Sequence, residues 1–133
     1  MQRVWDRYSN VKNDWVEKIT NYLSSQYQYI CMEDLNIKGM LKNRKLSGKF
    51  QSVSLYRLIE RLKTKAEVIQ VDRFFPSSKL CSNCGQIKDD LKLSDRVYNC
   101  DCGLIIDRDH NAALNILRQA MSLKSVDKKA LVI

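Results

Sequence analysis

The segment Cys81-Ser-Asn-Cys-Gly85, followed by Cys100-Asp-Cys-Gly103, determines how the C-terminal half of this chain folds. Two cysteine pairs joined by a loop of about 15–20 residues are typical of a zinc site, in which four thiolates surround one ion as a tetrahedron. A glycine follows each pair and can adopt the positive φ that a sharp turn around a metal requires. Two disulfides are the alternative. The spacing predicts a zinc ribbon whose ligands are Cys81, Cys84, Cys100 and Cys102.

Length and composition restrict the remaining possibilities. With 133 residues, 44% of them hydrophobic, the chain has room for one domain, or for one small domain with an insert. The first residues are polar and basic, and no apolar run approaches the roughly 18 residues of a membrane span, so we expect a cytoplasmic protein. In that reducing compartment, paired cysteines bind metal more often than they form disulfides. The net charge of +8 favours a polyanionic partner, by default nucleic acid.

Hydrophobic periodicity predicts helices over residues 4–25 and 50–65, and aromatic and β-branched residues predict strands over 27–35 and 66–75. The first strand is apolar from Tyr29 to Met32, as expected for a strand buried on both faces. The order strand, helix, strand indicates a βαβ unit with parallel strands, and therefore the α/β class. The first helix is expected to turn one stripe toward the core: Val4, Tyr8, Val11, Trp15, Ile19 and Leu23.

The ribbon and the C-terminal residues complete the predicted organisation. Residues 91–98 have strand character, and we expect a short hairpin to connect the two cysteine knuckles. After the ribbon, Asp107 or Asp109 can cap a helix, with His110 on its surface. Residues from 122 onward are rich in Lys and Asp, and we expect a frayed tail. The buried stripe of this last helix is predicted to consist of Ala113, Ile116, Leu117 and Ala120.

Two acidic positions are candidates for chemistry. Glu33 ends the buried strand, where a carboxylate is costly unless a cation lies beside it, and a solvated strand end is the alternative. Asp107 and Asp109 begin the last helix. If the chain returns to the sheet after the ribbon, these carboxylates converge and can bind Mg²⁺ or Mn²⁺. Two such ions can clamp the attacking and leaving oxygens of a phosphodiester.

Residues 36–49 are basic and contain two glycines, which predicts an exposed loop with a short helical turn. Positive side chains in such a loop can contact a phosphate backbone, although a merely solvated loop explains them as well. The candidates for nucleic-acid contact are Lys38, Lys42, Arg44 and Lys45.

Three segments together resemble the OrfB/TnpB family of transposon-encoded proteins, which is related to type V CRISPR effectors. They are residues 32–36 (Met-Glu-Asp-Leu-Asn), residues 75–85 (Phe-Pro-Ser-Ser-Lys-Leu-Cys-Ser-Asn-Cys-Gly) and residues 107–116 (Asp-Arg-Asp-His-Asn-Ala-Ala-Leu-Asn-Ile). The resemblance extends from about residue 4 to residue 117. It implies a partial RNase H-like (RuvC-type) fold, with a nuclease core over 1–75, an inserted zinc ribbon over 76–106, the last helix over 107–121 and a tail over 122–133.

The resemblance also implies roles for individual residues. The family's second catalytic carboxylate corresponds to Glu33 and its third to Asp109, with Asp107 and Asn111 as supporting residues of the same motif. In the family these groups hold divalent metals, Mg²⁺ or Mn²⁺, and cut DNA that a guide RNA has selected. DNA and a guide RNA are therefore the expected partners, and transposition the expected context.

The chain differs from the family pattern at two places. The second knuckle is Cys-x-Cys, one residue shorter than in many relatives, and we expect it to bind zinc through a tighter turn. Nothing before Glu33 resembles the Gly-Ile-Asp-like segment that carries the first catalytic aspartate. The chain therefore resembles the C-terminal part of such a nuclease and carries two of the three expected carboxylates, so we expect it to be inactive alone. The alternatives are a non-catalytic zinc-ribbon module that binds DNA or RNA, and a structural zinc domain that assembles with a partner.

The missing first strands would have a physical consequence. In an RNase H-type sheet they lie beside the strand that carries Glu33. Without them that strand would have an open apolar edge, which invites pairing with another chain. We therefore expect self-association through this edge.

Overall fold

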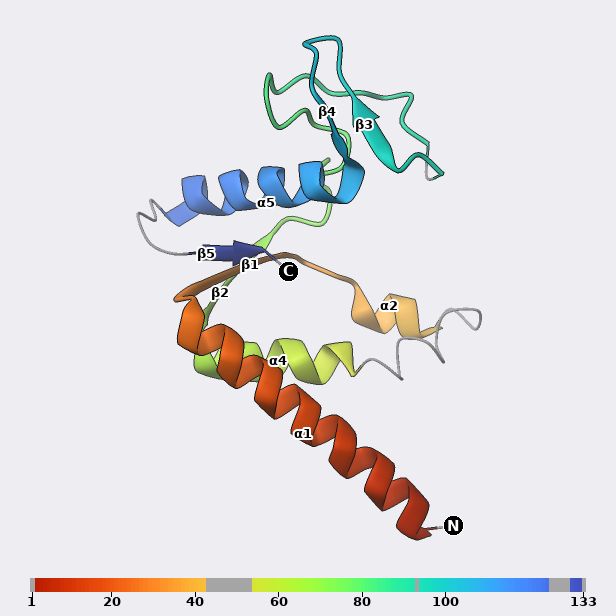
Figure 1. The fold of residues 1–133 in the computed structure, drawn as a ribbon, viewed down its shortest axis with the longest axis vertical. Coiled ribbons are helices and arrows are strands. Elements are labelled where there is room, and N and C mark those ends of the chain that lie inside the picture. The colour runs from red at the N-terminus through yellow and green to blue at the C-terminus, as the bar shows by residue number, and fades with distance from the viewer. Residues whose placement is uncertain (1, 43–53, 93, 125–129, 133) are drawn as a thin grey trace. The chain divides into compact units, whose positions relative to one another are not determined.

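The computed structural model describes residues 2–42, 54–92, 94–124 and 130–132 (Figure 1). Packing divides them into two units, which we describe separately: a helical unit (residues 1–30 and 35–68) and a ribbon unit (residues 31–34 and 69–133). The chain contains both helices and strands, which fits the predicted α/β class. The elements are α1 (Gln2–Gln26), β1 (Tyr29–Glu33), α2 (Ile37–Lys42), α4 (Leu55–Lys65), β2 (Glu67–Val71), β3 (Val97–Asn99), β4 (Ile105–Asp107), α5 (Arg108–Lys124) and β5 (Ala130–Val132).

In the helical unit, α1 and α4 lie side by side and run in the same direction. The periodicity that predicts a helix over 50–65 agrees with the packing of α4, in which Leu58, Ile59 and Leu62 are buried. The hydrogen bond from Lys65 lowers the pKa of Glu17; partial burial opposes this, and the positive charges of Arg61 and Lys65 reinforce it. Three side-chain contacts join successive turns of the two helices: Arg57 with Asn13, Arg61 with Glu17, and Lys65 with Asn21.

The predicted core stripe of α1 is wrong for its N-terminal half. Val4 is 72% exposed, Val11 62% and Trp15 46%, whereas Val16 and Thr20 are buried. The register of the two helices explains the exposure of Val4 and Val11, whereas Trp15 is exposed because it lies off the face of α1 that contacts α4. Helix α4 has 11 residues and α1 has 25, and the contacts with α4 begin only at Asn13. The hydrophobic pattern therefore continues along α1 beyond the part that α4 covers.

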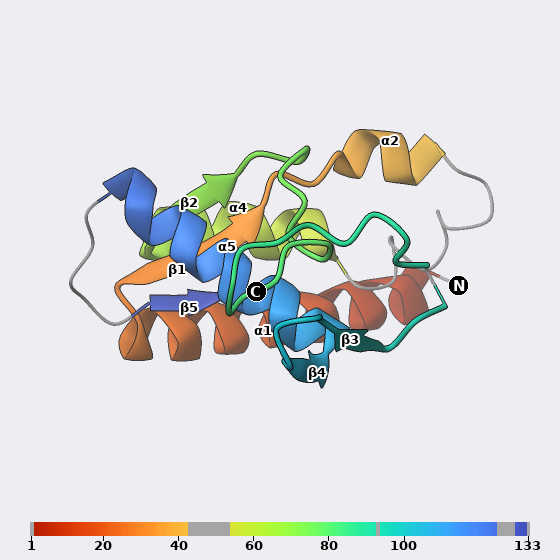
Figure 2. The ribbon, with the colours of Figure 1, turned by 90° about the horizontal axis from the view of Figure 1, so that it is seen from above.

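The three-stranded sheet has the order β2-β1-β5, with the strands side by side (Figure 2). The N–H of Glu67 donates to Gln28 O where β1 and β2 begin, and the N–H of Asp34 donates to Val71 O where they end. Matching ends therefore meet, and the predicted parallel pairing of the βαβ unit is confirmed. Ile30, Cys31 and Met32 are at most 3% exposed, as predicted for a strand covered on both faces.

Strand β5 overturns two expectations about the C-terminal residues. Ala130–Val132 form a strand beside β1, so these residues are not a frayed tail, and residues 125–129 lie outside the described part of the chain. Strand β1 has neighbours on both sides, so the expected open edge of β1 is wrong. Helix α5 also extends beyond the predicted end at residue 121, to Lys124. The apolar Ala-Leu-Val segment supplies the backbone partners that β1 requires on its second edge.

Helix α5 lies along one face of the sheet in the ribbon unit and contacts β5 (Figures 1 and 2). Its N-terminus follows β4 directly, and β4 pairs with β3 in an antiparallel hairpin. Among the described helices, none contains a stretch long and apolar enough to cross a bilayer.

We expect that removal of residues 130–133 causes self-association, because it exposes the second edge of β1 to another chain. Light scattering should show a monomer for the full chain and larger species for the shortened chain as concentration rises. Replacing Val132 with Lys is the milder variant, since a charge on an edge strand discourages pairing without deleting backbone. A shortened chain that stays monomeric at high concentration would contradict the assignment of β5 as the cover of β1.

Candidate metal centre and candidate carboxylates

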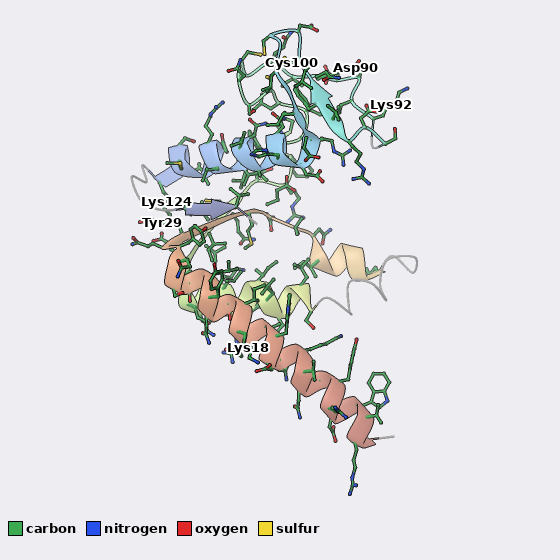
Figure 3. The ribbon with its side chains drawn as sticks, in the orientation of Figure 1. Lys18, Tyr29, Asp90, Lys92, Cys100 and Lys124 are labelled. Atoms are coloured by element: carbon green, nitrogen blue, oxygen red, sulfur yellow. The ribbon has the colours of Figure 1, made fainter. Side chains whose placement is uncertain are left out.

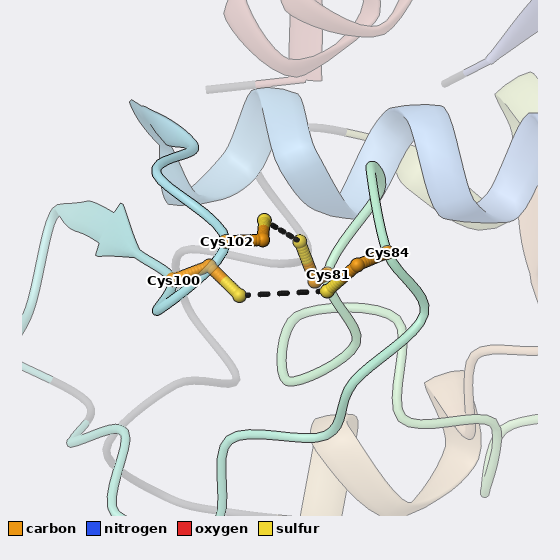
Figure 4. A group of neighbouring side chains, drawn as sticks. All are labelled: Cys81, Cys84, Cys100 and Cys102. Carbon is orange, nitrogen blue, oxygen red and sulfur yellow. Dashed lines mark hydrogen bonds between the residues drawn. The ribbon is translucent and has the colours of Figure 1, made fainter.

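The four cysteines predicted as zinc ligands come together, although they lie in two knuckles of the ribbon (Figure 4). Their Sγ atoms all lie within 4.8 Å of one another. The Sγ atoms of Cys81 and Cys102 are 3.7 Å apart, and those of Cys84 and Cys100 are 3.6 Å apart. Four sulfurs at about 2.3 Å from a tetrahedral zinc ion would be about 3.8 Å apart, whereas a disulfide bond is about 2.0 Å long. The spacing fits a metal, and the alternative of two disulfides is wrong because these cysteines are free thiols.

Backbone hydrogen bonds explain how a shorter knuckle can supply the same two ligands. In the first knuckle, Cys81 N donates to Gln86 O and Gly85 N donates to Cys81 O. In the second, Cys100 N donates to Leu104 O and Gly103 N donates to Cys100 O, so each bond spans one residue fewer. Gly85 and Gly103 have φ values of +77° and +91°, as predicted for the turn after each pair.

The pKa values of neighbouring thiols in the cluster shift in opposite directions, as expected for cysteines placed close enough to bind one cation. The N–H of Leu104 donates to Cys102, and the side chains of Asn83 and Cys100 add to this effect, so the pKa of Cys102 falls to about 6. The N–H of Cys102 favours the thiolate of Cys100, but burial and the three neighbouring sulfurs outweigh it and raise the pKa of Cys100 to about 12. A divalent cation at the centre would reverse that repulsion, because coordinating thiols are deprotonated.

The ribbon is held by a small core of its own. Tyr98 is fully buried, and its hydroxyl donates to Lys79 O at 2.9 Å, which ties β3 to the segment before the first knuckle. Burial, followed by the charges of the cysteines, raises the pKa of Tyr98 to about 12. Asp90 and Lys92 lie on the ribbon away from α5 (Figure 3).

The ribbon hairpin differs from the predicted one. We expected a strand over residues 91–98 in a hairpin between the knuckles, but β3 covers only Val97–Asn99. Its partner β4 follows the second knuckle, with Tyr98 opposite Ile106. The second knuckle is therefore the turn of the hairpin, and two of the four candidate ligands, Cys100 and Cys102, lie inside that turn.

Glu33 lies at the end of β1, where it was predicted, and it is neither fully buried nor fully exposed. The hydroxyl of Ser77 donates to Glu33 Oε1, and the next carboxylate, Asp34, pairs with Arg73. Sequence reasoning did not single out Ser77, although it belongs to the quoted segment 75–85.

The ambiguity between the two aspartates at the start of α5 is resolved. Asp107 Oδ1 accepts hydrogen bonds from the N–H groups of Asp109 and His110, at 2.9 and 3.0 Å, so Asp107 is the cap. These N–H groups lower the pKa of Asp107, with His110 as the larger contributor; slight desolvation opposes them. The side chain of Asp109 is 75% exposed and has Arg108 as its ion-pair partner at 3.5 Å. His110 is exposed, as predicted.

Two asparagines of α5 are buried, and sequence reasoning gave only one of them a role. Asn111, expected to support the motif, is 0% exposed, and Asn115 is 1% exposed. Both were outside the predicted apolar stripe, of which Ile116 and Ala120 are buried. The signal that could have found them is their spacing of four residues, which places them on the same helix face as each other.

Two of the four candidate nucleic-acid residues lie outside the described part of the chain. Lys38 belongs to α2, and Lys42 is the exposed last residue of that helix. Arg44 and Lys45 lie outside the described residues. Among the described residues, the four cysteines form the one cluster of three or more groups that could hold a metal, so Glu33 and Asp109 do not belong to such a cluster.

We expect one zinc ion per chain, bound by four sulfurs. Replacing Cys84 with Ser should reduce the zinc content below one per chain and lower Tm, because the free energy of metal binding contributes directly to folding. Cys31→Ser is the matched control for zinc content, since Cys31 is buried in β1 outside the cluster. Elemental analysis and thermal unfolding measure both effects; unchanged zinc content and Tm in Cys84→Ser would contradict the assignment.

The comparisons with known proteins agree with one another. Residues 56–116 match the family model described as the Cas12f1-like TNB domain. A protein of Streptomyces pristinaespiralis named "Putative RNA-guided DNA endonuclease" is 37% identical over 125 residues, which is 90% of this chain and 31% of that protein. A TnpB-like protein of Acanthamoeba polyphaga mimivirus is 37% identical over 124 residues, or 84% of this chain and 23% of that protein. The chain thus spans about a quarter to a third of the length of these curated relatives.

A solved structure shows a similar fold. It is the cryo-EM structure of a Cas12f1–sgRNA–target DNA complex, matched with a TM-score of 0.50 and 19% identity over 86% of this chain and 34% of that chain. The family model and the named relatives make this chain similar to the TnpB family, which is related to type V effectors.

Proposed function

We propose that the chain forms the C-terminal portion of a transposon-associated, RNA-guided DNA endonuclease that hydrolyses phosphodiesters with divalent metals. The observation that carries this proposal is a chain of hydrogen bonds between the elements of the two candidate carboxylates. Ser77 donates its hydroxyl to Glu33, and Asn115 donates to the carbonyl of Ser77. Asn115 belongs to α5, the helix whose first turn contains Asp109. The Streptomyces relative carries the corresponding activity in its name. The domain boundaries that go with this function are the nuclease core over 1–75, the ribbon over 76–106 and the last helix from 107, which ends at Lys124 and is followed by β5.

In this proposal Glu33 and Asp109 are catalytic residues that hold Mg²⁺ or Mn²⁺ on a partial RuvC-like sheet. Both are carboxylates, the ligands that these hard cations prefer. Glu33 ends a parallel strand, and Asp109 lies in the first turn of a helix, where its carboxylate is exposed and not used for capping. Two metals of this kind would stabilise the attacking and leaving oxygens of the phosphodiester. A third carboxylate is needed from elsewhere, so the chain is expected to be inactive alone.

The cysteine cluster has a different part in this proposal. Its metal is zinc, because four thiolates at tetrahedral spacing suit that ion better than Mg²⁺ or Mn²⁺. The four cysteine sulfurs would fill all positions of a tetrahedral zinc ion, as in structural zinc sites, and would leave no open position for a substrate. The zinc therefore fixes the passage from the second knuckle through β4 into α5, and with it the position of Asp109.

DNA and a guide RNA are the proposed partners. The solved relative is a complex with sgRNA and target DNA, and the chain has a net charge of +8. Lys42, and by sequence Lys38, Arg44 and Lys45, are the proposed contacts to the phosphate backbone. A cytoplasmic location is consistent with such partners.

A non-catalytic zinc-ribbon module that binds DNA or RNA is the second candidate. The observation that favours it is that the described carboxylates form no cluster of three. In that case the ribbon and the basic residues 36–49 would still bind nucleic acid, and Glu33 and Asp109 would be polar surface groups.

Mn²⁺ binding to the zinc-loaded chain separates the two candidates. We expect Mn²⁺ to broaden the carboxyl ¹³C NMR signals of Glu33 and Asp109 before those of the other acidic residues. Glu33→Gln and Asp109→Asn should each weaken Mn²⁺ binding by more than about 10-fold, the loss typical of an outer-shell partner. Glu67→Gln changes the same charge on β2 and serves as the control. Broadening that is uniform over all carboxylates would favour the non-catalytic module.

Salt dependence tests the contact with nucleic acid. We expect binding of single-stranded DNA to weaken as salt rises, and Lys42→Ala to reduce the slope of log K against log[salt] by about 0.7, the value for one phosphate contact. Lys18→Ala is the control, because this exposed lysine of α1 pairs with Asp14 (Figure 3). Affinity that does not change with salt would leave the structural zinc domain as the better interpretation.

A further inference from the structure

Residues 77–82 connect the two candidate sites within the ribbon unit, because this segment touches both. Its first residue, Ser77, donates its hydroxyl to Glu33 Oε1. Its last residues, Cys81 and Ser82, belong to the first knuckle of the cysteine cluster. Both serines are buried, at 5% and 8% exposure, so the segment is inside the protein at its two ends.

One face of α5 holds this segment through side-chain hydrogen bonds. Asn115 donates its Nδ2 to Ser77 O at 2.8 Å and to Leu80 O at 2.6 Å. Asn111 donates to Leu80 O at 2.7 Å, and its Oδ1 accepts from Ser82 N at 2.9 Å. Arg118 donates to Ser82 O at 2.6 Å. Residues 111, 115 and 118 have the spacing of a single helix face.

The two asparagines therefore act on opposite ends of the same segment. Asn111 contacts Ser82, next to Cys81, and Asn115 contacts Ser77, next to Glu33. Their only shared acceptor in the described contacts is Leu80 O. Asn115 acts as a donor alone, since its buried Oδ1 has no hydrogen-bond partner among the described residues. Losing its amide would remove the donor to Ser77 O, whereas Leu80 O would keep the hydrogen bond from Asn111, so the Ser77 end of the segment would have to move to satisfy its carbonyl.

We propose that Asn115 is a positioning residue for Glu33, acting through Ser77, while Asn111 positions the cysteine cluster. The carbonyl and the hydroxyl of Ser77 belong to one residue. When Asn115 fixes the carbonyl, the hydroxyl is therefore aimed at Glu33, and the carboxylate is held in one orientation. The proposed function enters only in naming Glu33 as a metal ligand. The hydrogen-bond relay from α5 to Glu33 does not depend on it.

Leucine substitutions test whether Asn115 and Asn111 have these separate roles, because leucine has the branched shape of asparagine without its polar atoms. The chain contains four glutamates, so carboxyl-labelled glutamate gives a spectrum in which Glu33→Gln identifies the Glu33 signal. We expect Asn115→Leu and Ser77→Ala to shift this signal in the same direction. The double variant should shift it no further than Ser77→Ala alone, since residues that act through one another are not additive. Ser78→Ala, the same change one residue along, should leave it in place.

Asn111→Leu is the matched control on the same helix face. It should weaken zinc binding by about 10-fold in chelator competition, the loss typical of an outer-shell partner, and leave the Glu33 signal in place. Asn115→Leu should show the opposite pattern. Should Asn115→Leu fail to fold, Asn115→Asp replaces it, because aspartate keeps the shape and loses the donor.

Two results would overturn the inference. One is an Asn115 variant with an unchanged Glu33 signal, and the other is an equal shift of that signal in Asn111→Leu and Asn115→Leu. Either would mean that the asparagines only stabilise the fold. Failure of the proposed function has a separate signature, since Mn²⁺ would then not broaden the Glu33 signal of the wild-type chain, whatever the variants do.

Discussion

The hydrogen bonds between α5 and residues 77–82 are the constraint on which the ribbon unit depends. They join buried amides to buried carbonyls, and such groups are costly to leave unpaired. The segment therefore has a single favourable position against the helix. Because it begins beside Glu33 and ends in the first cysteine knuckle, the same contacts define the geometry of both candidate sites.

The position of the cysteine cluster in the chain indicates its structural role. The second knuckle is the turn between β3 and β4, and β4 leads directly into α5, whose first turn Asp107 caps. A zinc ion bound by four protein sulfurs would have no open position for a substrate. In the proposed function its contribution would be to hold the start of α5, and therefore Asp109, relative to residues 77–82.

The three-stranded sheet is formed by strands that lie far apart in the sequence. Strand β1 is apolar on both faces and has backbone groups on two edges that must be satisfied. Strand β2 occupies one edge and β5 the other, although β5 is only three residues long and follows a polar stretch. In the helical unit, by contrast, part of an apolar surface remains exposed among the described residues, because α4 is too short to cover the whole apolar stripe of α1.

The features that the sequence determined by itself are those whose partners lie nearby in the chain. The cysteine spacing, the glycines after each pair, the apolar run of β1 and the stripe of α4 all follow from local geometry. Only the tertiary structure decided which part of α1 is covered, what lies beside β1, and that Asn111 and Asn115 are buried. An asparagine in a helix is expected to face water, and these two do not, because the carbonyls that they bind lie 31 and 38 residues earlier in the chain. No local pattern indicates a partner at that separation, so the hydrogen bonds of these two asparagines to residues 77–82 could be identified only from the tertiary structure.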